Sequence, residues 1–152
     1  MLFLLFQIGK DYYALDTRQV AVVLSLVNLK QMPATAPWVA GVFTYRGQSV
    51  PVIDLSQLAL GRPALRRLST RMVLVHYPVP GAGERLLGLV LEKASEIMRR
   101  EPSEFRDSGL DHGNAPYLGP VTDDMRGLIQ AIRIQDLLPP DVRAQLFPAG
   151  GQ

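Results

Sequence analysis

The chain has 152 residues, of which 47% are hydrophobic and 7% aromatic, and this composition excludes intrinsic disorder, a collagen-like sequence and a coiled coil. It contains no cysteine, which excludes disulfides, thiolate metal sites and cysteine nucleophiles and is typical of a reducing compartment. The formal net charge is only +2 and the basic residues are scattered, so charge alone does not predict nucleic-acid binding. The length favours one domain or two closely joined halves.

The apolar opening Met1–Phe6 lacks the features of a signal peptide. It has no basic n-region, it is shorter than an h-region, and the polar run Gly9–Asp11 ends it. No later apolar run is long enough to span a bilayer. We therefore expect a cytoplasmic protein.

Short apolar runs separated by turn residues fill the first part of the chain. Residues 2–8 and 12–15 predict two strands paired across a turn, and residues 20–24 predict a third. Asp16 occupies a possible N-cap position three residues before Gln19, which favours a single helical turn between strands. Residues 28–36 predict a loop, after which Trp38 is expected to anchor the core.

The stretch Gly41–Leu55 is the most informative part of the sequence. Two strand-like runs flank a polar break, in which Gly47 can take the positive φ that a tight reversal needs. The pattern predicts a hairpin with Arg46 at its tip, where the planar guanidinium is offered to a partner. Pro51 has no amide hydrogen, so the second arm is expected at a sheet edge or a bulge.

The middle of the chain predicts a helix, a linker and a strand pair. Residues 56–60 favour a short helix and residues 62–70 a linker. Residues 71–77 and 86–91 predict two antiparallel strands joined by a turn at 78–83. Residues 92–98 fit a strand and a short helix equally well.

The last part predicts a long surface loop followed by two strands. The loop spans residues 101–116, and the strands are expected at 117–118 and 127–132, with Asp123 and Asp124 in the turn between them. Helical turns are expected at 133–138 and 141–147, ahead of a glycine-rich end. Nine or ten short strands in total predict an all-β protein, mainly β with short helices, built as small barrels or a sandwich.

No catalytic or metal-binding constellation stands out. His76 lies on a predicted strand, and His112 lies near Asp107 and Asp111 at a spacing that matches no defined metal site. The run Gly81–Gly83 leads into a strand, so the helix N-terminus that would hold a phosphate is missing. No serine occupies a nucleophile-elbow pattern. We expect a protein that is not an enzyme and that uses no cofactor and no metal.

The alternative function is that of a small nucleic-acid-binding barrel, which needs a basic face interleaved with exposed aromatic rings. The aromatic residues fall mainly in predicted strands and are expected in the core. The only basic doublets are Arg66-Arg67 and Arg99-Arg100, which we expect on solvated loops. We therefore expect no nucleic-acid partner.

One stretch of the chain reads Gly41-Val42-Phe43-Thr44-Tyr45-Arg46-Gly47-Gln48-Ser49-Val50-Pro51-Val52-Ile53-Asp54-Leu55. This stretch resembles the strongest motif of the CheW-like adaptors of bacterial chemosensory systems. In that family the motif has the form Gly-Val-x-Asn-Leu-Arg-Gly-x-x-Val-Pro-Ile-Val-Asp-Leu. The similarity extends from about residue 2 to residue 138. The other segments that carry it are Tyr13–Asp16, Val20, Pro37–Val39, Gly88–Leu91, Tyr117-Leu118 and Ile134–Leu138.

The resemblance implies two SH3-like five-stranded β-barrels, interleaved in a single CheW-like domain at residues 1–140, with a C-terminal helix and tail at 141–152. It also implies a scaffold that couples the cytoplasmic helical tips of chemoreceptors to the regulatory domain of a CheA-type histidine kinase. Such a protein is expected in the cytoplasm at membrane-associated receptor arrays, without inserting into the membrane. It would assemble into arrays rather than form a fixed homo-oligomer.

The resemblance also implies which residues meet each partner. Contacts with the receptor are expected at Val20, Gly41, Thr44, Tyr45, Arg46 and Gly47, with Gly41 supporting the geometry of the hairpin. Contacts with the kinase are expected at Val22 and Val23.

The chain departs from the family's pattern at three places. Thr44-Tyr45 replaces the usual Asn-Leu, Val22 stands where an acidic residue is frequent, and Lys93 stands where a glycine is common. These departures suit an adaptor of an alternative system, such as one that controls surface behaviour or a cyclic-dinucleotide synthase.

Overall fold

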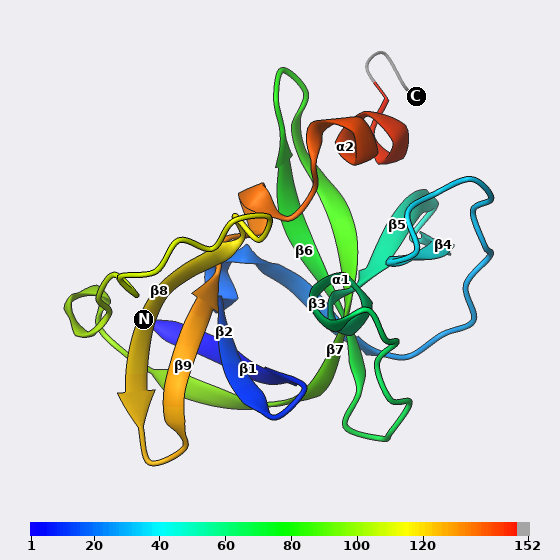
Figure 1. The fold of residues 1–152 in the computed structure, drawn as a ribbon. Coiled ribbons are helices and arrows are strands. Elements are labelled where there is room, and N and C mark those ends of the chain that lie inside the picture. Colours follow the sequence, from blue (N-terminus) through cyan, green and yellow to red (C-terminus); the bar gives the residue numbers. More distant parts are fainter. Residues whose placement is uncertain (149–152) are drawn as a thin grey trace.

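The computed structural model describes residues 1–148, which form nine β-strands and a few short helices (Figure 1). The strands in chain order are β1 (Leu2–Ile8), β2 (Asp11–Asp16), β3 (Val20–Ser25), β4 (Val39–Tyr45), β5 (Gln48–Asp54), β6 (Arg71–Val79), β7 (Gly83–Arg99), β8 (Leu118–Asp124) and β9 (Gly127–Ile132). The helices are α1 (Leu55–Leu60), α2 (Pro140–Leu146) and 3₁₀ turns at Thr17–Gln19, Pro102–Glu104 and Ile134–Asp136. The expected glycine-rich end, at 149–152, lies outside the described residues. Within residues 1–148, no helix has the length and apolar character needed to cross a bilayer.

The strands form two groups of five that share the long strand β7. The first barrel contains β1, β2, β8, β9 and the C-terminal half of β7, and the second contains β3, β4, β5, β6 and the N-terminal half (Figure 1). Strand β7 pairs with β6 over Gly83–Leu91 and with β1 over Glu92–Arg99. The prediction of an all-β fold with two five-stranded barrels is confirmed.

Each barrel is closed by one isolated β-bridge. The residue that forms it follows β3 in the second barrel and β7 in the first. In the second barrel, Lys30 and Val42 exchange two backbone hydrogen bonds of 2.9 Å. In the first barrel, Arg106 and Val121 exchange two of 2.8 Å. The long loop predicted at 101–116 is therefore not only a surface loop, because its Arg106 closes the first barrel.

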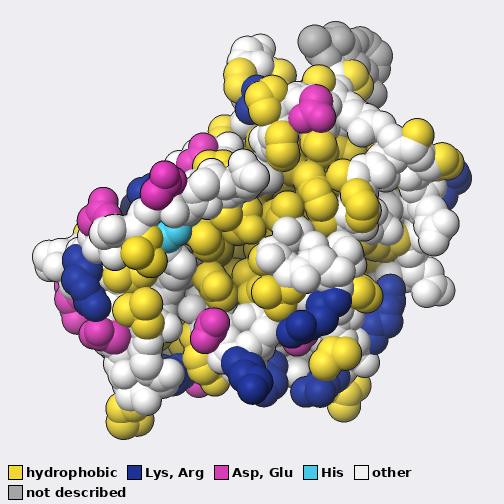
Figure 2. Space-filling model, in the orientation of Figure 1, with side chains coloured by type: hydrophobic (Ala, Val, Ile, Leu, Met, Phe, Trp, Pro, Cys, Tyr) yellow, Lys and Arg dark blue, Asp and Glu magenta, His cyan; other side chains and the backbone are white. Residues whose placement is uncertain are grey.

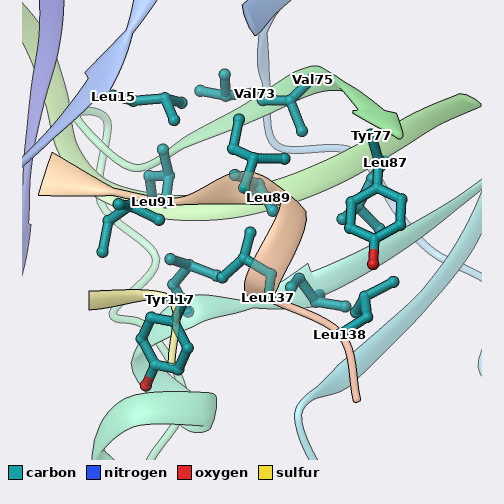
Figure 3. Close-up of a cluster of buried hydrophobic side chains, with 14 of the residues drawn as sticks. Leu15, Val73, Val75, Tyr77, Leu87, Leu89, Leu91, Tyr117, Leu137 and Leu138 are labelled. Atoms are coloured by element: carbon teal, nitrogen blue, oxygen red, sulfur yellow. The ribbon is translucent and has the colours of Figure 1, made fainter. Parts of the chain in front are cut away.

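Three hydrophobic clusters fill and join the barrels. Phe3, Leu5, Ala14, Met98 and Ile129 form the core of the first barrel. The core of the second barrel consists of Val50, Val52, Met72, Leu74 and Val90. The largest cluster, which we call the inter-barrel cluster, draws on both barrels and on the C-terminal helices (Figure 3).

Strands β6 and β7 contribute to two of these clusters because their side chains alternate between faces. Met72 and Leu74 point into the second barrel, whereas Val73 and Val75 point into the inter-barrel cluster. Burial of both faces explains why these strands read as continuous apolar runs instead of alternating polar and apolar residues. Because β6 and β7 contribute to both the second-barrel core and the inter-barrel cluster, they also hold the two barrels together.

Helix α2 covers one end of the inter-barrel cluster. Its Val142 and Leu146 are buried, and the ring of Phe147 stacks on Tyr77 with centroids 5.7 Å apart. Tyr77 is fully buried and its hydroxyl forms no hydrogen bond with the described residues. Burial raises the pKa of the Tyr77 phenol, and the nearby Arg143 offsets part of that rise. The helix predicted near the C-terminus therefore belongs to the core.

Some predicted boundaries are wrong. The turn expected at 78–83 is shorter, because β6 extends to Val79 and β7 begins at Gly83. Strand β8 runs to Asp124, so the turn follows Asp123 and Asp124 instead of containing them. The register of β8 shifts next to Pro120, and this bulge lets the strand continue past a proline. Residues 92–98 are strand.

Lys93 has a backbone strain that a glycine would relieve. Its φ is +50° where β7 passes from the second barrel to the first, and the β1–β7 register shifts at the same place. A side chain at positive φ costs about 1 kcal/mol relative to glycine. We expect Lys93→Gly to raise the free energy of unfolding by about 0.5–1 kcal/mol, measured by urea denaturation.

Lys93→Ala is the matched control, because it removes the ammonium group but keeps the Cβ atom and the strain. We expect it to leave the urea midpoint almost unchanged. A loss of stability in Lys93→Gly would show that the lysine side chain contributes more than its backbone geometry costs.

Candidate functional site

The β4–β5 hairpin ends in a two-residue turn formed by Arg46 and Gly47. Tyr45 pairs with Gln48, and the turn residues have φ values of +48° and +79°. Two consecutive positive φ values define the turn whose twist matches that of the flanking strands. The predicted hairpin and the positive φ of Gly47 are confirmed. The sequence does not indicate the positive φ of Arg46, since this position usually holds asparagine, aspartate or glycine.

The guanidinium group of Arg46 lies over the ring of the preceding Tyr45, with the Cζ atom 5.4 Å from the ring centroid. The ring is itself held, because Tyr45 packs half-buried against the core of the second barrel and lies 6.3 Å from Phe43. A cation over an aromatic face gains about 0.5–1 kcal/mol at an exposed site. Tyr45 therefore restricts the directions in which exposed Arg46 can point, while exposed Thr44 lies beside it.

Gly41 is required by the closure of the second barrel. It is buried with φ +145°, and a Cβ atom there would lie 2.5 Å from the carbonyl oxygen of Lys30. It would also lie 2.9 Å from Cβ of Leu29. The bridge between Lys30 and Val42 can thus form only where the chain has no side chain. Gly41 thus permits the close approach of the Leu29-Lys30 segment to β4 and has no side chain to offer a partner.

The base of the hairpin is tied to the helix that follows it. The Asp54 amide donates to the carbonyl oxygen of Trp38 at 2.8 Å. The Asp54 carboxylate accepts hydrogen bonds from the amides of Ser56 at 3.0 Å and Gln57 at 3.2 Å, which caps α1. Trp38 is half-buried against the inter-barrel cluster, in agreement with its predicted role as an anchor.

A bulge in β3 makes the side chains of the predicted contact valines face different parts of the protein. Val20 pairs with Val75 and Val22 with Leu74, so Ala21 is the extra residue. Val20 packs against the inter-barrel cluster, whereas Val22 packs against the core of the second barrel. Val23 is 44% exposed on the outer face. Of the two predicted kinase contacts, Val23 is therefore the more accessible.

The tip of the hairpin borders a groove of about 700 Å³. One wall is formed by Gly47, Gln48 and Ser49, and the others come from the β6–β7 hairpin and the end of α2. Those walls contain His76, Glu84, Arg85, Leu86, Leu146, Phe147 and Pro148. The structure brings these segments together from distant parts of the chain, so no local sequence pattern could have revealed them. Val20 does not line this groove.

A second hollow lies between the two barrels and is largely apolar. Figure 2 shows hydrophobic atoms lining a furrow across the centre of this face. A cavity of about 460 Å³ there is bordered by Leu58 of α1, by Tyr117, and by the segment Leu137–Pro140.

His112, Asp107 and Asp111 take part in hydrogen bonds of the loop between β7 and β8, and His112 also lies close to β9. The Nε2 atom of His112 lies 2.9 Å from the Ser108 hydroxyl and 3.3 Å from the Gln130 side-chain nitrogen. The carboxylates of Asp107 and Asp111 accept hydrogen bonds from the amides two residues further on. Within residues 1–148, no three His, Asp or Glu side chains lie close enough to hold a metal ion.

Comparison with known proteins identifies a family for this chain. Residues 2–140 match the family model described as a CheW-like domain. The chemotaxis protein CheW of Helicobacter pylori is 24% identical over 144 residues, which cover 91% of this chain and 82% of that protein. The chemotaxis protein CheW of Klebsiella aerogenes is 23% identical over 104 residues, which cover 68% of this chain and 60% of that protein.

A solved structure shows the same fold. The scaffolding protein TtCheW from Thermoanaerobacter tengcongensis superimposes with a TM-score of 0.79 at 19% identity, over 93% of this chain and 89% of that one. The family model covers nearly the whole chain, including both barrels and the Arg46 hairpin. This protein therefore belongs to the CheW-like family.

Proposed function

We propose that the protein is a non-enzymatic scaffold that couples chemoreceptor tips to a CheA-type histidine kinase in a bacterial chemosensory system. The observation that carries this proposal is the CheW-like match over residues 2–140, which includes the Arg-Gly hairpin. Two relatives are named chemotaxis proteins, and a structural neighbour is named a scaffolding protein. The output pathway is either chemotaxis proper or an alternative one that controls surface behaviour or a cyclic-dinucleotide synthase.

The receptor contact is centred on Arg46. Its side chain is exposed, and within residues 1–148 it forms no ion pair with a carboxylate. The groove beside it has apolar walls at Leu86 and Phe147 and charged groups at Glu84 and Arg85, which suits an amphipathic helix. A carboxylate on the receptor helix would pair with the guanidinium fork. Thr44, Tyr45 and Gly47 form the immediate rim, while Val20 would contribute from the inter-barrel side.

The kinase contact uses the outer side of β3. This strand stands at the end of the strand order, so one of its edges pairs with no other strand of the described chain. Val23 projects from that strand, and Val22 supports it from inside the barrel. An apolar edge strand without lysine or proline is open to pairing with another β-protein. A kinase regulatory domain would dock here, barrel against barrel.

Direct binding separates the parts of this proposal. The full chain is titrated with the cytoplasmic fragment of the cognate receptor and, separately, with the cognate kinase. Binding to both supports the coupling scaffold, and binding to the receptor alone would reduce it to a receptor adaptor. Failure to bind a folded receptor fragment, together with salt-dependent retention on heparin, would overturn the proposal in favour of a nucleic-acid-binding barrel.

Val23→Asp is expected to abolish co-purification with the kinase while leaving receptor binding unchanged. The carboxylate would be desolvated in an apolar interface, which costs several kcal/mol. Because Val23 is 44% exposed, the fold should tolerate the change. Leu128→Asp, at a 56% exposed position of the first barrel, is the matched control. Unchanged kinase binding by Val23→Asp would exclude β3 as the kinase contact.

A further inference from the structure

The connection between α1 and β6 carries an isolated concentration of positive charge. From Leu55 to Gly83 the chain contains four arginines, at 62, 66, 67 and 71, and neither aspartate nor glutamate. We call residues 62–71 the arginine loop. Figure 2 shows dark-blue basic atoms and yellow hydrophobic atoms side by side at the lower edge of the molecule, where Figure 1 places this loop.

Hydrogen bonds to the neighbouring strands hold the arginine loop in a defined conformation. The Asp54 carboxylate accepts from the Ala64 amide at 2.9 Å, and the Glu92 carboxylate accepts from the Leu65 amide at 2.9 Å. The carbonyl oxygen of Ser69 accepts from the Ala94 amide at 3.1 Å. Strands β5 and β7 therefore hold the loop at several points.

Further hydrogen bonds, within the loop and from α1, fix its conformation. The Thr70 hydroxyl is buried, donates to the Leu65 carbonyl and accepts from the Arg67 amide at 3.2 Å. The guanidinium of Arg71 donates to the Leu68 carbonyl. The Ser56 hydroxyl reaches the carbonyl of Arg62 at 2.9 Å.

This fixed loop holds two leucines in solvent among the arginines. Leu68 is 94% exposed and Leu65 is 53% exposed. The side chains of Arg62, Arg66 and Arg67 are exposed, and within residues 1–148 none forms an ion pair. The adjacent carboxylates, Asp54 and Glu92, already accept from the loop's own backbone. Exposed apolar side chains surrounded by unpaired positive charges are typical of a surface that binds another molecule.

A cavity of about 370 Å³ lies beside the loop. It is bordered by Pro63, Ala64 and Arg66 of the loop and by Leu26, Val27 and Leu29 from the segment after β3. Val27 is itself 38% exposed at this rim. The cavity can receive apolar side chains from a partner whose charged groups lie over the arginines.

We propose that the arginine loop docks an acidic amphipathic helix of another protein. The helix's carboxylates pair with Arg62, Arg66 and Arg67, and its apolar side chains cover Leu65 and Leu68 and enter the cavity. Leucines and carboxylates at helical spacing supply both chemistries on one partner. This surface is distinct from Arg46 and Val23 and does not depend on the coupling function proposed above.

Other anionic partners fit the loop less well. A lipid headgroup layer would neutralise the arginines but has no side chains to fill the cavity. A nucleic acid gains by stacking on exposed aromatic rings, and the arginine loop has none. Leucines held in solvent favour an apolar counterpart over a phosphate backbone.

The test uses the full chain and a fluorescein-labelled synthetic peptide of Glu, Leu and Ala about five helical turns long, with leucines at i, i+3, i+4 and i+7. Fluorescence anisotropy is expected to show binding that weakens as salt is added, because exposed ion pairs are screened. Arg66→Glu with Arg67→Glu is expected to lower the affinity about tenfold or more, and so is Leu65→Ser with Leu68→Ser. The same peptide with lysine in place of glutamate should not bind.

Matched controls separate this surface from general charge and stickiness. Arg99→Glu with Arg133→Glu makes the same change in net charge at exposed positions elsewhere and should keep the wild-type affinity. Met125→Ser with Leu128→Ser removes two exposed apolar side chains from the first barrel and should also bind normally. The urea midpoint of every variant verifies that it is folded.

Three results would overturn the proposal. One is the absence of peptide binding at about millimolar protein, which corresponds to less than about 4 kcal/mol of binding free energy. Another is equal peptide binding by the wild type and both arginine-loop variants. The third is a loss of binding to phosphatidylserine vesicles or single-stranded DNA in the loop variants while peptide binding stays unchanged, which would assign the loop to a lipid or nucleic-acid partner.

Discussion

Gly41→Ala is expected to destabilise the protein by about 3 kcal/mol or more, because both the backbone angle and the space at this position exclude a side chain. The new Cβ atom would lie 2.5 Å from the Lys30 carbonyl oxygen, which is a backbone atom and cannot rotate away. Relief of the clash would separate Lys30 from Val42 and break the two hydrogen bonds that close the second barrel. A fall in the urea midpoint, or loss of soluble protein, is the measured result.

Gly47→Ala is the control for this prediction. Gly47 also has positive φ, at +79°, but nothing lies within 4 Å of the position that its Cβ would take. Gly47→Ala should therefore lower the free energy of unfolding by only about 1 kcal/mol, which is the conformational penalty of a side chain at positive φ. The difference between the two variants isolates the steric contribution of barrel closure. If Gly41→Ala cost no more than Gly47→Ala, the bridge from Lys30 would not be what requires a glycine.

Arg46→Ala is expected to weaken binding to the cognate receptor fragment by about 2–5 kcal/mol, which is about 30-fold or more in affinity. The substitution leaves the receptor's carboxylate without a partner and removes the cation at the hairpin tip. Because the Arg46 side chain is exposed, the free energy of unfolding should change by less than about 0.5 kcal/mol. Titration of the fragment with each variant measures the effect.

Two companion variants sharpen the test of Arg46. Arg99→Ala removes an exposed arginine from the first barrel and should leave receptor affinity unchanged. Tyr45→Leu restores the residue usual in the family and removes the ring beneath the guanidinium, so a loss of a few-fold is expected. Equal affinity of Arg46→Ala and the wild type would remove Arg46 from the site. Tighter binding by Tyr45→Leu would mean that the ring draws Arg46 away from its partner.

Local chemistry explains which features could be predicted from the sequence. The hairpin and its reversal at Gly47 follow from a glycine between two apolar runs. Pro51 was expected at an edge or a bulge, and it pairs with Val42 in the part of β5 that precedes the pairing with β7. The turn after Asp16 exists because the carboxylate accepts from the Arg18 amide at 2.9 Å. Each of these depends on neighbours within a few residues.

The remaining features depend on contacts between distant segments. The stacking of Arg46 on Tyr45 requires the ring to be fixed by the core of the second barrel, which strands distant in sequence build. The bulge at Ala21, which separates Val20 from Val22, is defined only by pairing with β6. The same holds for the arginine loop, whose exposed leucines read in the sequence as part of an ordinary linker.

Because the two barrels share β7, they are expected to fold at different times during synthesis on the ribosome. All strands of the second barrel lie between Val20 and Leu91, so that barrel can form while the rest of the chain is still being made. The first barrel must wait, because β2 pairs in parallel with β9, which emerges near the end of synthesis. Until then the apolar edge of β2 has no partner, and an unpaired edge invites aggregation. A nascent chain stalled before β8 would therefore carry one finished barrel and one exposed edge.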